Sequence, residues 1–176
     1  GGGTVEIPLS DSDYEIIKQA ESNGNWRAQS SAGAFGLYQF LRSTWIRVMN
    51  TPEGRAAGLT MGGWKSKRPH QQEKAMRILT QYNARSLSQK GLPINIETIY
   101  FAHHFGIKHA TDVYSKPDSA KLPKGFVTST VLESNPQLKG IKTVGQMRKY
   151  IKEALKRGER AVKKADKSNA LDVSIN

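Results

Sequence analysis

Apolar residues recur at helical spacing along most of the chain, and this periodicity is the feature that most limits its possible folds. The clearest case runs from about residue 71 to 89, where the pattern stops at Gly91 and Pro93. No segment shows the strict alternation of a half-buried strand, although GFVTSTV at 125–131 allows a short extended piece. We therefore expect a mainly α, single-domain protein with little or no sheet.

The same spacing and the usual helix-capping residues predict the other elements. Helices are expected over 11–21, 37–49, 95–105 and 106–114, and a last one begins at Thr143. Asp11 or Ser12 caps the first helix, and Asn95 caps the helix at 95–105. Segments rich in Gly, Ser, Asn and Pro predict loops at 22–35, 50–69 and 115–125, the second as an irregular excursion over the surface.

The chain has 176 residues, enough for one domain with a real core, and carries a formal net charge of +12. Residues 139–167 hold eleven Lys and Arg against three acids, a net +8. This charge favours an anionic partner, such as nucleic acid, an acidic membrane surface or an acidic cell-wall polymer. We expect a flexible lead at 1–10, a main domain at 11–146, and a basic C-terminal helix and tail at 147–176 packed on that domain.

Several kinds of site find no support in the sequence. Cysteine is absent, which excludes disulfides and thiolate metal sites, and neither an HEXXH nor a Cys/His pattern occurs among the four histidines. GxSxG and GxxxxGK[ST] motifs are absent too. The basic helix has no interleaved aromatics for base stacking, so we do not expect nucleic acid as the partner, and a solvated basic face remains the simpler interpretation. No run of about 18 apolar residues and no signal-like leader is visible.

One carboxylate stands out, because Glu21 lies in AESNGNW where the first helical pattern breaks. Ala20, Trp26 and Phe35 surround it with apolar groups that would raise its pKa, as a general acid requires near neutral pH. The Gly-rich stretch that follows lets backbone approach a bulky ligand. Gln39 then offers an amide suited to hydrogen bonds with a sugar or a peptide.

Residues 21–45, ESNGNWRAQSSAGAFGLYQFLRSTW, resemble the signature of the lytic transglycosylases, the SLT or goose-lysozyme-like family. The matching pieces are Glu21-Ser22, Ser30, Gly33, Gly36-Leu37 and Gln39, in the order and spacing of the family. A third family motif, usually Ala-Tyr-Asn-Ala-Gly, is similar to Ala102–Gly106, but His103 stands where the tyrosine is expected and Tyr100 lies one helical turn earlier. The resemblance runs from about Ser12 to Gln146.

The resemblance implies a lysozyme-like helical fold at 11–146 and cleavage of peptidoglycan between N-acetylmuramic acid and N-acetylglucosamine, with a 1,6-anhydro product. It implies that Glu21 is acid and then base, without a metal or cofactor. Ser30 and Gln39 would position the sugar, and the further cleft candidates are Tyr38, Tyr100 and His103, with core packing as the alternative for Tyr38. No motif surrounds Glu15 or Glu53, which we expect to be surface acids.

YxAHxxG at 100–106 and SNPQLKGIKTVGQ at 134–146 are similar to phage-derived members. They imply a virion-associated lysin, or one released to the wall or periplasm of the host. The expected partners are peptidoglycan strands and, through the basic helix, anionic envelope polymers, with the chain as a monomer. Two alternatives stay open: a hydrolytic lysozyme of the same fold, and an inactive wall- or DNA-binding module.

Overall fold

The computed structural model describes the backbone of residues 5–175 and the side chains of residues 5–169. This part of the chain forms one mainly α domain without a sheet, in which strand-like pairing is limited to isolated bridges. The elements are α1 (Asp11–Ser22), α2 (Arg42–Met49), α3 (Pro52–Ala56), α4 (Met61–Trp64), α5 (His70–Gln89), α6 (Ile96–Phe105), α7 (Ile107–Tyr114), α8 (Ser129–Ser134), the 3-10 helix η1 (Pro136–Leu138) and α9 (Val144–Ile175).

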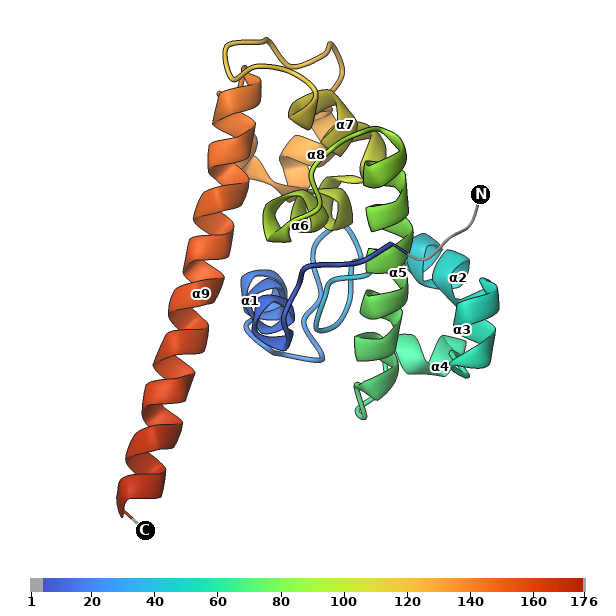
Figure 1. Ribbon diagram of the computed structural model, residues 1–176, viewed down its shortest axis with the longest axis vertical. Helices are drawn as coiled ribbons and strands as arrows, with labels where there is room; N and C mark the ends of the chain where they lie inside the picture. The colour runs from blue at the N-terminus through green and yellow to red at the C-terminus, as the bar shows by residue number, and fades with distance from the viewer. Residues whose placement is uncertain (1–4, 176) are drawn as a thin grey trace.

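The helices surround one core, which α5 and α6 cross near its middle. α9 runs along one side of the molecule against α1, and α2 to α4 lie on the opposite side of α5 (Figure 1). Among the largest fully buried side chains are Ile17 of α1, Trp45 of α2, Met76 of α5, Phe101 of α6 and Ile151 of α9, so every long helix contributes to the same core. Within the described residues, no helix is long and apolar enough to cross a membrane.

Local capping chemistry explains most helix starts. The long α5 and the Asn95 cap of α6 agree with the sequence prediction, and Asn95 and Thr98 form a reciprocal capping box. α1 begins at residue 11 as predicted, but its N-cap is Ser10 rather than Asp11 or Ser12, and the Ser10 hydroxyl accepts the backbone N–H of Asp13. Thr143 precedes α9 as predicted, and its hydroxyl accepts the backbone N–H of Gln146.

Three sequence predictions of local structure are wrong. The helix expected over 37–49 begins only at Arg42, since residues 36–41 form tight turns with positive φ at Gly36 and Gln39. The excursion at 50–69 contains α3 and α4, each started by a capping threonine, and buries Trp64 in the core. The extended piece at 125–131 is instead the approach to α8.

Residues near both ends of the described chain pack against the core. Residues 1–4 of the predicted flexible lead lie outside the described residues, while Val5, Ile7 and Leu9 are half-buried against the core. α9 crosses the predicted boundary at 146/147 without interruption. Met147 and Ile151 are fully buried, so the first half of this helix belongs to the domain core.

Candidate active site

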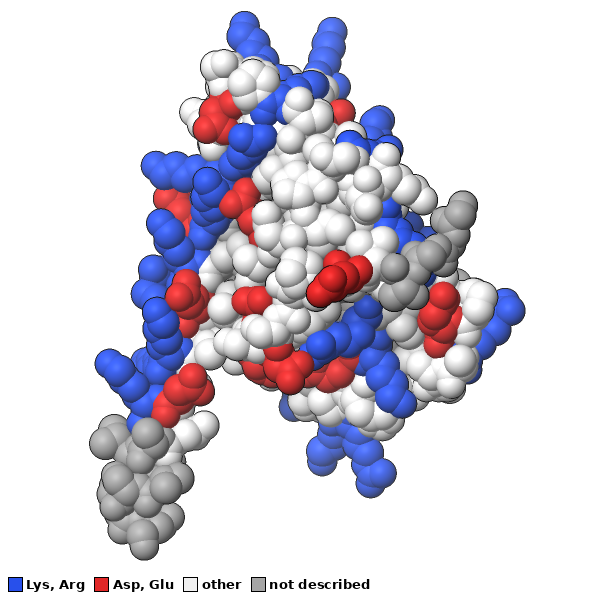
Figure 2. Space-filling view, viewed as in Figure 1, with Lys and Arg blue, Asp and Glu red and all other residues white. Residues whose placement is uncertain are grey.

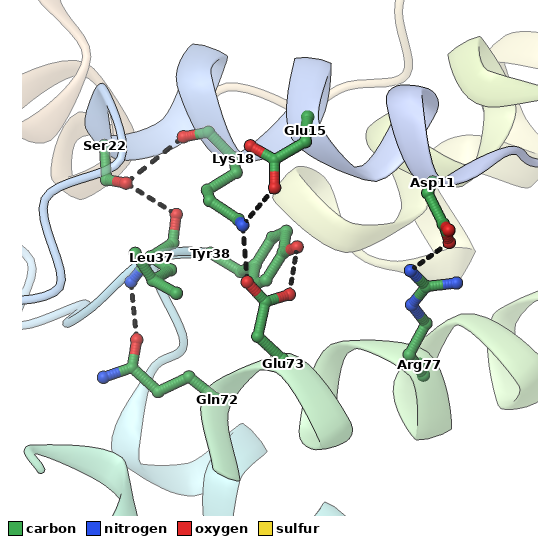
Figure 3. Close-up of polar contacts among 9 residues, drawn as sticks. All are labelled: Asp11, Glu15, Lys18, Ser22, Leu37, Tyr38, Gln72, Glu73 and Arg77. Atoms are coloured by element: carbon green, nitrogen blue, oxygen red, sulfur yellow. Dashed lines mark hydrogen bonds and ion pairs between the residues drawn. The ribbon is translucent and has the colours of Figure 1, made fainter. Parts of the chain in front are cut away.

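Glu21 lies in the last turn of α1, just before the helix ends at Asn23 in a left-handed conformation. Its side chain is only 5% exposed. The neighbouring Ser22 hydroxyl donates to Leu37 O at 2.7 Å and also lies 3.2 Å from Lys18 O, so it fastens the end of α1 to the following loop (Figure 3). The carboxyl is therefore held at a fixed point between the helix and the loop.

The glycine-containing loop at 28–40 is folded around Gln39. Its side-chain Nε2 donates to Ala28 O and to Gly36 O, both at 2.9 Å. Gly36 itself has φ +93° and passes so close to Gln72 that an added Cβ would lie 2.2 Å from the Gln72 Oε1. Gln72 Oε1 in turn accepts the Leu37 N–H at 2.6 Å, which anchors the loop on α5 (Figure 3). A side chain at position 36 would push the loop off α5.

The two adjacent histidines of α6 reach different partners. Nδ1 of His104 lies 3.0 Å from Oε1 of Glu21, whereas Nε2 of His103 bonds the backbone carbonyl of Tyr38. Neighbouring helix positions point about 100° apart, which is why one histidine meets the carboxylate and the other holds the loop. Tyr100, one turn earlier, stacks on the His104 ring, with the two ring centroids 5.8 Å apart.

The electrostatics of Glu21 correct the sequence prediction of a raised pKa. Burial by itself raises the pKa of Glu21, but the His104 imidazolium, His103 and the Tyr100 hydroxyl outweigh it, so the net pKa lies below its ordinary value. Burial lowers the pKa of His104, and the Glu21 carboxylate outweighs that effect and raises it. Burial also lowers the pKa of His103, which keeps that ring neutral. In the free protein the mobile proton of the pair therefore rests on His104.

A cavity of about 350 Å³ opens beside Glu21. Its polar end carries the four predicted site residues that the structure brings together, namely Glu21, Ser30, Gln39 and His103. His104 and His109 also line it. The remaining wall is largely apolar and comes from the loop, α6 and the segment from Phe126 to Met147: Ala32, Ala34, Phe40, Leu41, Thr44, Phe105, Phe126, Val127, Val131, Ser134, Asn135, Leu138 and Met147.

Several polar groups of this cavity already form hydrogen bonds within the protein. The Ser30 hydroxyl accepts the Ala34 N–H at 3.1 Å, and both N–H groups of the Gln39 amide are used by the loop. Gln39 therefore offers its carbonyl oxygen rather than its amide nitrogen to a ligand. Nδ1 of His103 is buried and has no hydrogen-bond partner. Since Nε2–H donates to Tyr38, this Nδ1 is an acceptor in the neutral ring.

Two of the predicted cleft residues lie beneath the cavity wall. Tyr38 is 1% exposed, and its hydroxyl donates to Glu73 of α5 at 2.7 Å in a cluster with Lys18 (Figure 3). Tyr100 is also buried and acts on Glu21 from behind His104. Neither tyrosine lines the cavity.

Sequence reasoning missed His104 and the apolar wall formed by residues 126–138. The Tyr100–His104 spacing of four places both side chains on one helical face, and this could have pointed to His104 as the partner of Glu21.

The other acidic residues considered from the sequence have partners elsewhere. Glu15 pairs with Lys18, and Glu53 accepts the Tyr82 hydroxyl at 2.6 Å and lies 3.7 Å from Arg85. Among the residues that line the cavity, Glu21 supplies the single carboxylate. Within the described residues, no three His, Asp or Glu side chains converge in the manner of a metal site.

Residues 9–82 match the model of a family described as a transglycosylase-like domain. The matched segment spans α1, the glycine-containing loop and most of α5, and so includes Glu21, Ser30 and Gln39 but not the α6 histidines. No curated protein matches the chain. A transglycosylase-like domain implies an enzyme that cleaves glycosidic bonds, with a glycan as its substrate.

Proposed function

We propose that this chain is a peptidoglycan lytic transglycosylase, which cleaves the β-1,4 bond between N-acetylmuramic acid and N-acetylglucosamine. The observation that carries the proposal is Glu21, a buried carboxylate paired with His104 at one end of a cavity, inside the segment that matches the transglycosylase-like family. The lysozyme-like fold suggested by the sequence belongs to the same proposal. The catalytic unit would extend beyond 11–146, because the first half of α9 completes the core.

The first chemical step is protonation of the glycosidic oxygen by Glu21. In the free protein the proton rests on His104 Nδ1, 3.0 Å from Glu21 Oε1. A bound glycan displaces water from the cavity, and a dry site disfavours the separated charges of the carboxylate and the imidazolium. The proton then moves from Nδ1 to Oε1, which leaves a neutral pair and a carboxylic acid that can donate to the leaving oxygen.

The second step closes the anhydro ring. As the bond between C1 and the leaving oxygen breaks, the N-acetyl group of the muramic acid stabilises the cationic C1. The Glu21 carboxylate then takes the proton of the muramoyl 6-hydroxyl, whose oxygen forms the new bond to C1. The proton given to the leaving sugar is thereby returned, so the pair ends the cycle as it began. One carboxylate is enough for this sequence of steps, unlike the two-carboxylate glycosidases.

The remaining cavity residues would bind and orient the sugars. The Gln39 carbonyl oxygen and the Ser30 hydroxyl can meet hydroxyl or amide groups of the glycan, and the ring of His103 also lines the cavity. Tyr100 would position His104 and Glu21 rather than contact the substrate. The assignment to a phage lysin acting at the host wall rests on the resemblance of residues 100–106 and 134–146 and stays a prediction.

The mass of the released fragments tests the function and the reaction type together. We expect the chain to release muropeptides from purified peptidoglycan that are one water lighter than hydrolysis products and resist reduction by borohydride. Fragments with reducible ends would identify a hydrolytic lysozyme of the same fold instead. Binding to the wall without released fragments would identify an inactive binding module, and the Glu21→Gln variant supplies the blank for all three measurements.

A further inference from the structure

α9 is far longer than the domain needs to close its core. Its buried stripe consists of Val144, Met147, Ile151, Ala154 and Leu155, followed by Gly158. Beyond the half-buried Val162, residues 163–169 are exposed on every side of the helix. In Figure 1 this part projects past the end of α1 and touches no other element. Burial therefore does not account for the second half of the helix.

The outward face of α9 carries a dense row of cations. At 100° per residue, eight exposed Lys and Arg side chains fall within an arc of about 140° opposite the buried stripe. They are Lys149, Lys152, Lys156, Arg157, Arg160, Lys163, Lys164 and Lys167, which we call the α9 basic face. Glu153 is the one acid within the described part of this arc. The row is roughly 27 Å long, and Figure 2 shows it as a band of blue along that edge of the molecule.

Few of these charges are neutralised by the protein. The ion pairs that the structure describes on this face join Lys163 to Glu159 at 3.1 Å and Lys152 to Glu97 at 4.0 Å. Like charges at successive turns repel one another, which costs the helix stability unless something else compensates. Binding of an anionic chain in place of the counterions is therefore favourable for a row of this kind.

We infer that the α9 basic face docks a linear, phosphate-rich polymer of the bacterial envelope. A straight row of cations matches the repeating charges of a phosphodiester chain. The described side chains of the face include no aromatic group for base stacking and no exposed large apolar group for insertion into lipid, which disfavours single-stranded nucleic acid and a bilayer. The choice of a wall polymer rests on the proposed function, since a glycan-cleaving enzyme works where such polymers lie.

The geometry keeps docking and cleavage separate. Met147, on the buried side near the start of α9, lines the cavity, while the basic face points away from the body and runs on to Lys167. A docked polymer would therefore hold the enzyme at the wall without entering the cavity. Loss of docking should lower the binding of the enzyme to walls and leave turnover of short soluble glycan fragments unchanged.

The test uses the full chain carrying Glu21→Gln, so that binding is measured without cleavage. The first variant adds K156Q, R160Q, K163Q and K167Q, which keep good helix formers at exposed sites. The control variant adds R47Q, R55Q, K67Q and K90Q, four exposed cations on other elements, and so has the same net charge. The probes are soluble poly(glycerol phosphate), duplex DNA, and phosphatidylcholine vesicles with and without phosphatidylglycerol.

We expect the α9 variant to bind poly(glycerol phosphate) at least about tenfold more weakly than the control variant at low salt, with a shallower dependence of binding on salt. Circular dichroism checks that the helix is intact. Equal weakening in both variants would overturn the inference, because total charge alone would then explain binding. Tight binding only to DNA or only to anionic vesicles would also overturn it and name the other partner.

Failure of the docking proposal is distinguishable from failure of the proposed function. If the wild-type chain releases anhydro fragments but binds no polyanion, only the docking proposal fails. If it binds poly(glycerol phosphate) through α9 and releases no fragments, the glycan-cleaving function fails and the binding surface stands.

Discussion

Nδ1 of His104 lies 3.0 Å from Oε1 of Glu21, and this contact joins the last turn of α1 to the last turn of α6. The Glu21 side chain is buried. The contact between the two groups lowers the pKa of Glu21 and raises the pKa of His104. Between the lowered pKa of Glu21 and the raised pKa of His104, the pair therefore holds one proton. A unit that holds one proton can serve as an acid even though the carboxylate alone would be ionised.

Replacing Glu21 by Gln removes the proton donor and keeps the size of the side chain. We expect the Glu21→Gln variant to release fragments from peptidoglycan at least about 10²-fold to 10⁴-fold more slowly, as for the loss of a general acid. The variant should still fold, with a melting temperature lowered only by the loss of the ion pair with His104. Turbidity loss and differential scanning calorimetry measure the two properties. Glu53→Gln is the matched control, and lysis that survives in Glu21→Gln would remove Glu21 from the catalytic role.

His104→Gln should change the pH dependence of cleavage and not only its rate. In the wild type, activity falls with rising pH when the Glu21–His104 pair loses its proton. The raised pKa of His104 sets the pH at which this happens. Without His104, burial raises the pKa of Glu21 from about 4.5, and this pKa then sets the alkaline limit. Because a different group then sets the limit, the alkaline limb of kcat/KM should change position in His104→Gln.

His70→Gln, an exposed histidine in the first turn of α5, is the control for that shift. A limb that stays in place in His104→Gln would mean that His104 does not hold the catalytic proton. Stability gives an independent check. The His104 contribution is present below its unfolded pKa of about 6.5 and lost as pH rises through the higher folded value. The Glu21 contribution is present above its unfolded pKa and lost as pH falls through the lower folded value.

Tyr38→Phe separates a packing role from a substrate-binding role. The Tyr38 hydroxyl bonds Glu73, which also pairs with the largely buried Lys18, so its loss should cost about 1–2 kcal/mol of unfolding free energy. Turnover should change little, because Tyr38 does not line the cavity. Urea denaturation and initial rates on peptidoglycan measure both quantities. A large rise in KM with unchanged stability would show instead that Tyr38 reaches the substrate.

Much of the fold follows from local patterns that the sequence makes visible. The α5 stripe, the Asn95 cap and the break after Glu21 depend on short-range spacing and capping, so their positions could be predicted. α3 and α4 were missed because each is one or two turns long and is set by a threonine cap and by the burial of Leu59 and Trp64. Such short helices depend on tertiary contacts rather than on periodicity.

Site residues that lie in one short segment could be predicted from the sequence. Contacts between segments far apart in the sequence could not. Glu21, Ser30 and Gln39 lie within a single motif, and His103 came from the position of a second one. The sign of the Glu21 pKa shift could not be predicted, since it depends on His104, which is 83 positions away in the chain. Tyr38 and Tyr100 are of a residue type that is expected in a cleft. Their side-chain directions are set instead by packing on α5 and α6.

Gln39→Ala should open the glycine-containing loop. The change removes two hydrogen bonds to Ala28 O and Gly36 O, at a cost of about 1–3 kcal/mol of unfolding free energy. Because this loop forms one wall of the cavity, KM should rise together with the loss of stability. Thermal melting and kinetics on soluble glycan fragments measure the change, with Ser31→Ala, an exposed position of the same loop, as the control. A rise in KM without any loss of stability would assign Gln39 to substrate binding alone.

Gly158→Ala tests whether α9 packs tightly against α1 at Gly158, just before the projecting part of the helix. An added Cβ would lie 2.3 Å from Ile16 O, a backbone atom of α1 that cannot rotate away. α1 and α9 must then separate, which should cost about 1–3 kcal/mol and lower the melting temperature. Gly62→Ala is the control, because its Cβ would meet only Thr60 Oγ1 at 3.9 Å. Alanine there should leave stability unchanged or raise it by up to about 1 kcal/mol. A Gly158→Ala variant as stable as the wild type would show that the two helices are not in tight contact.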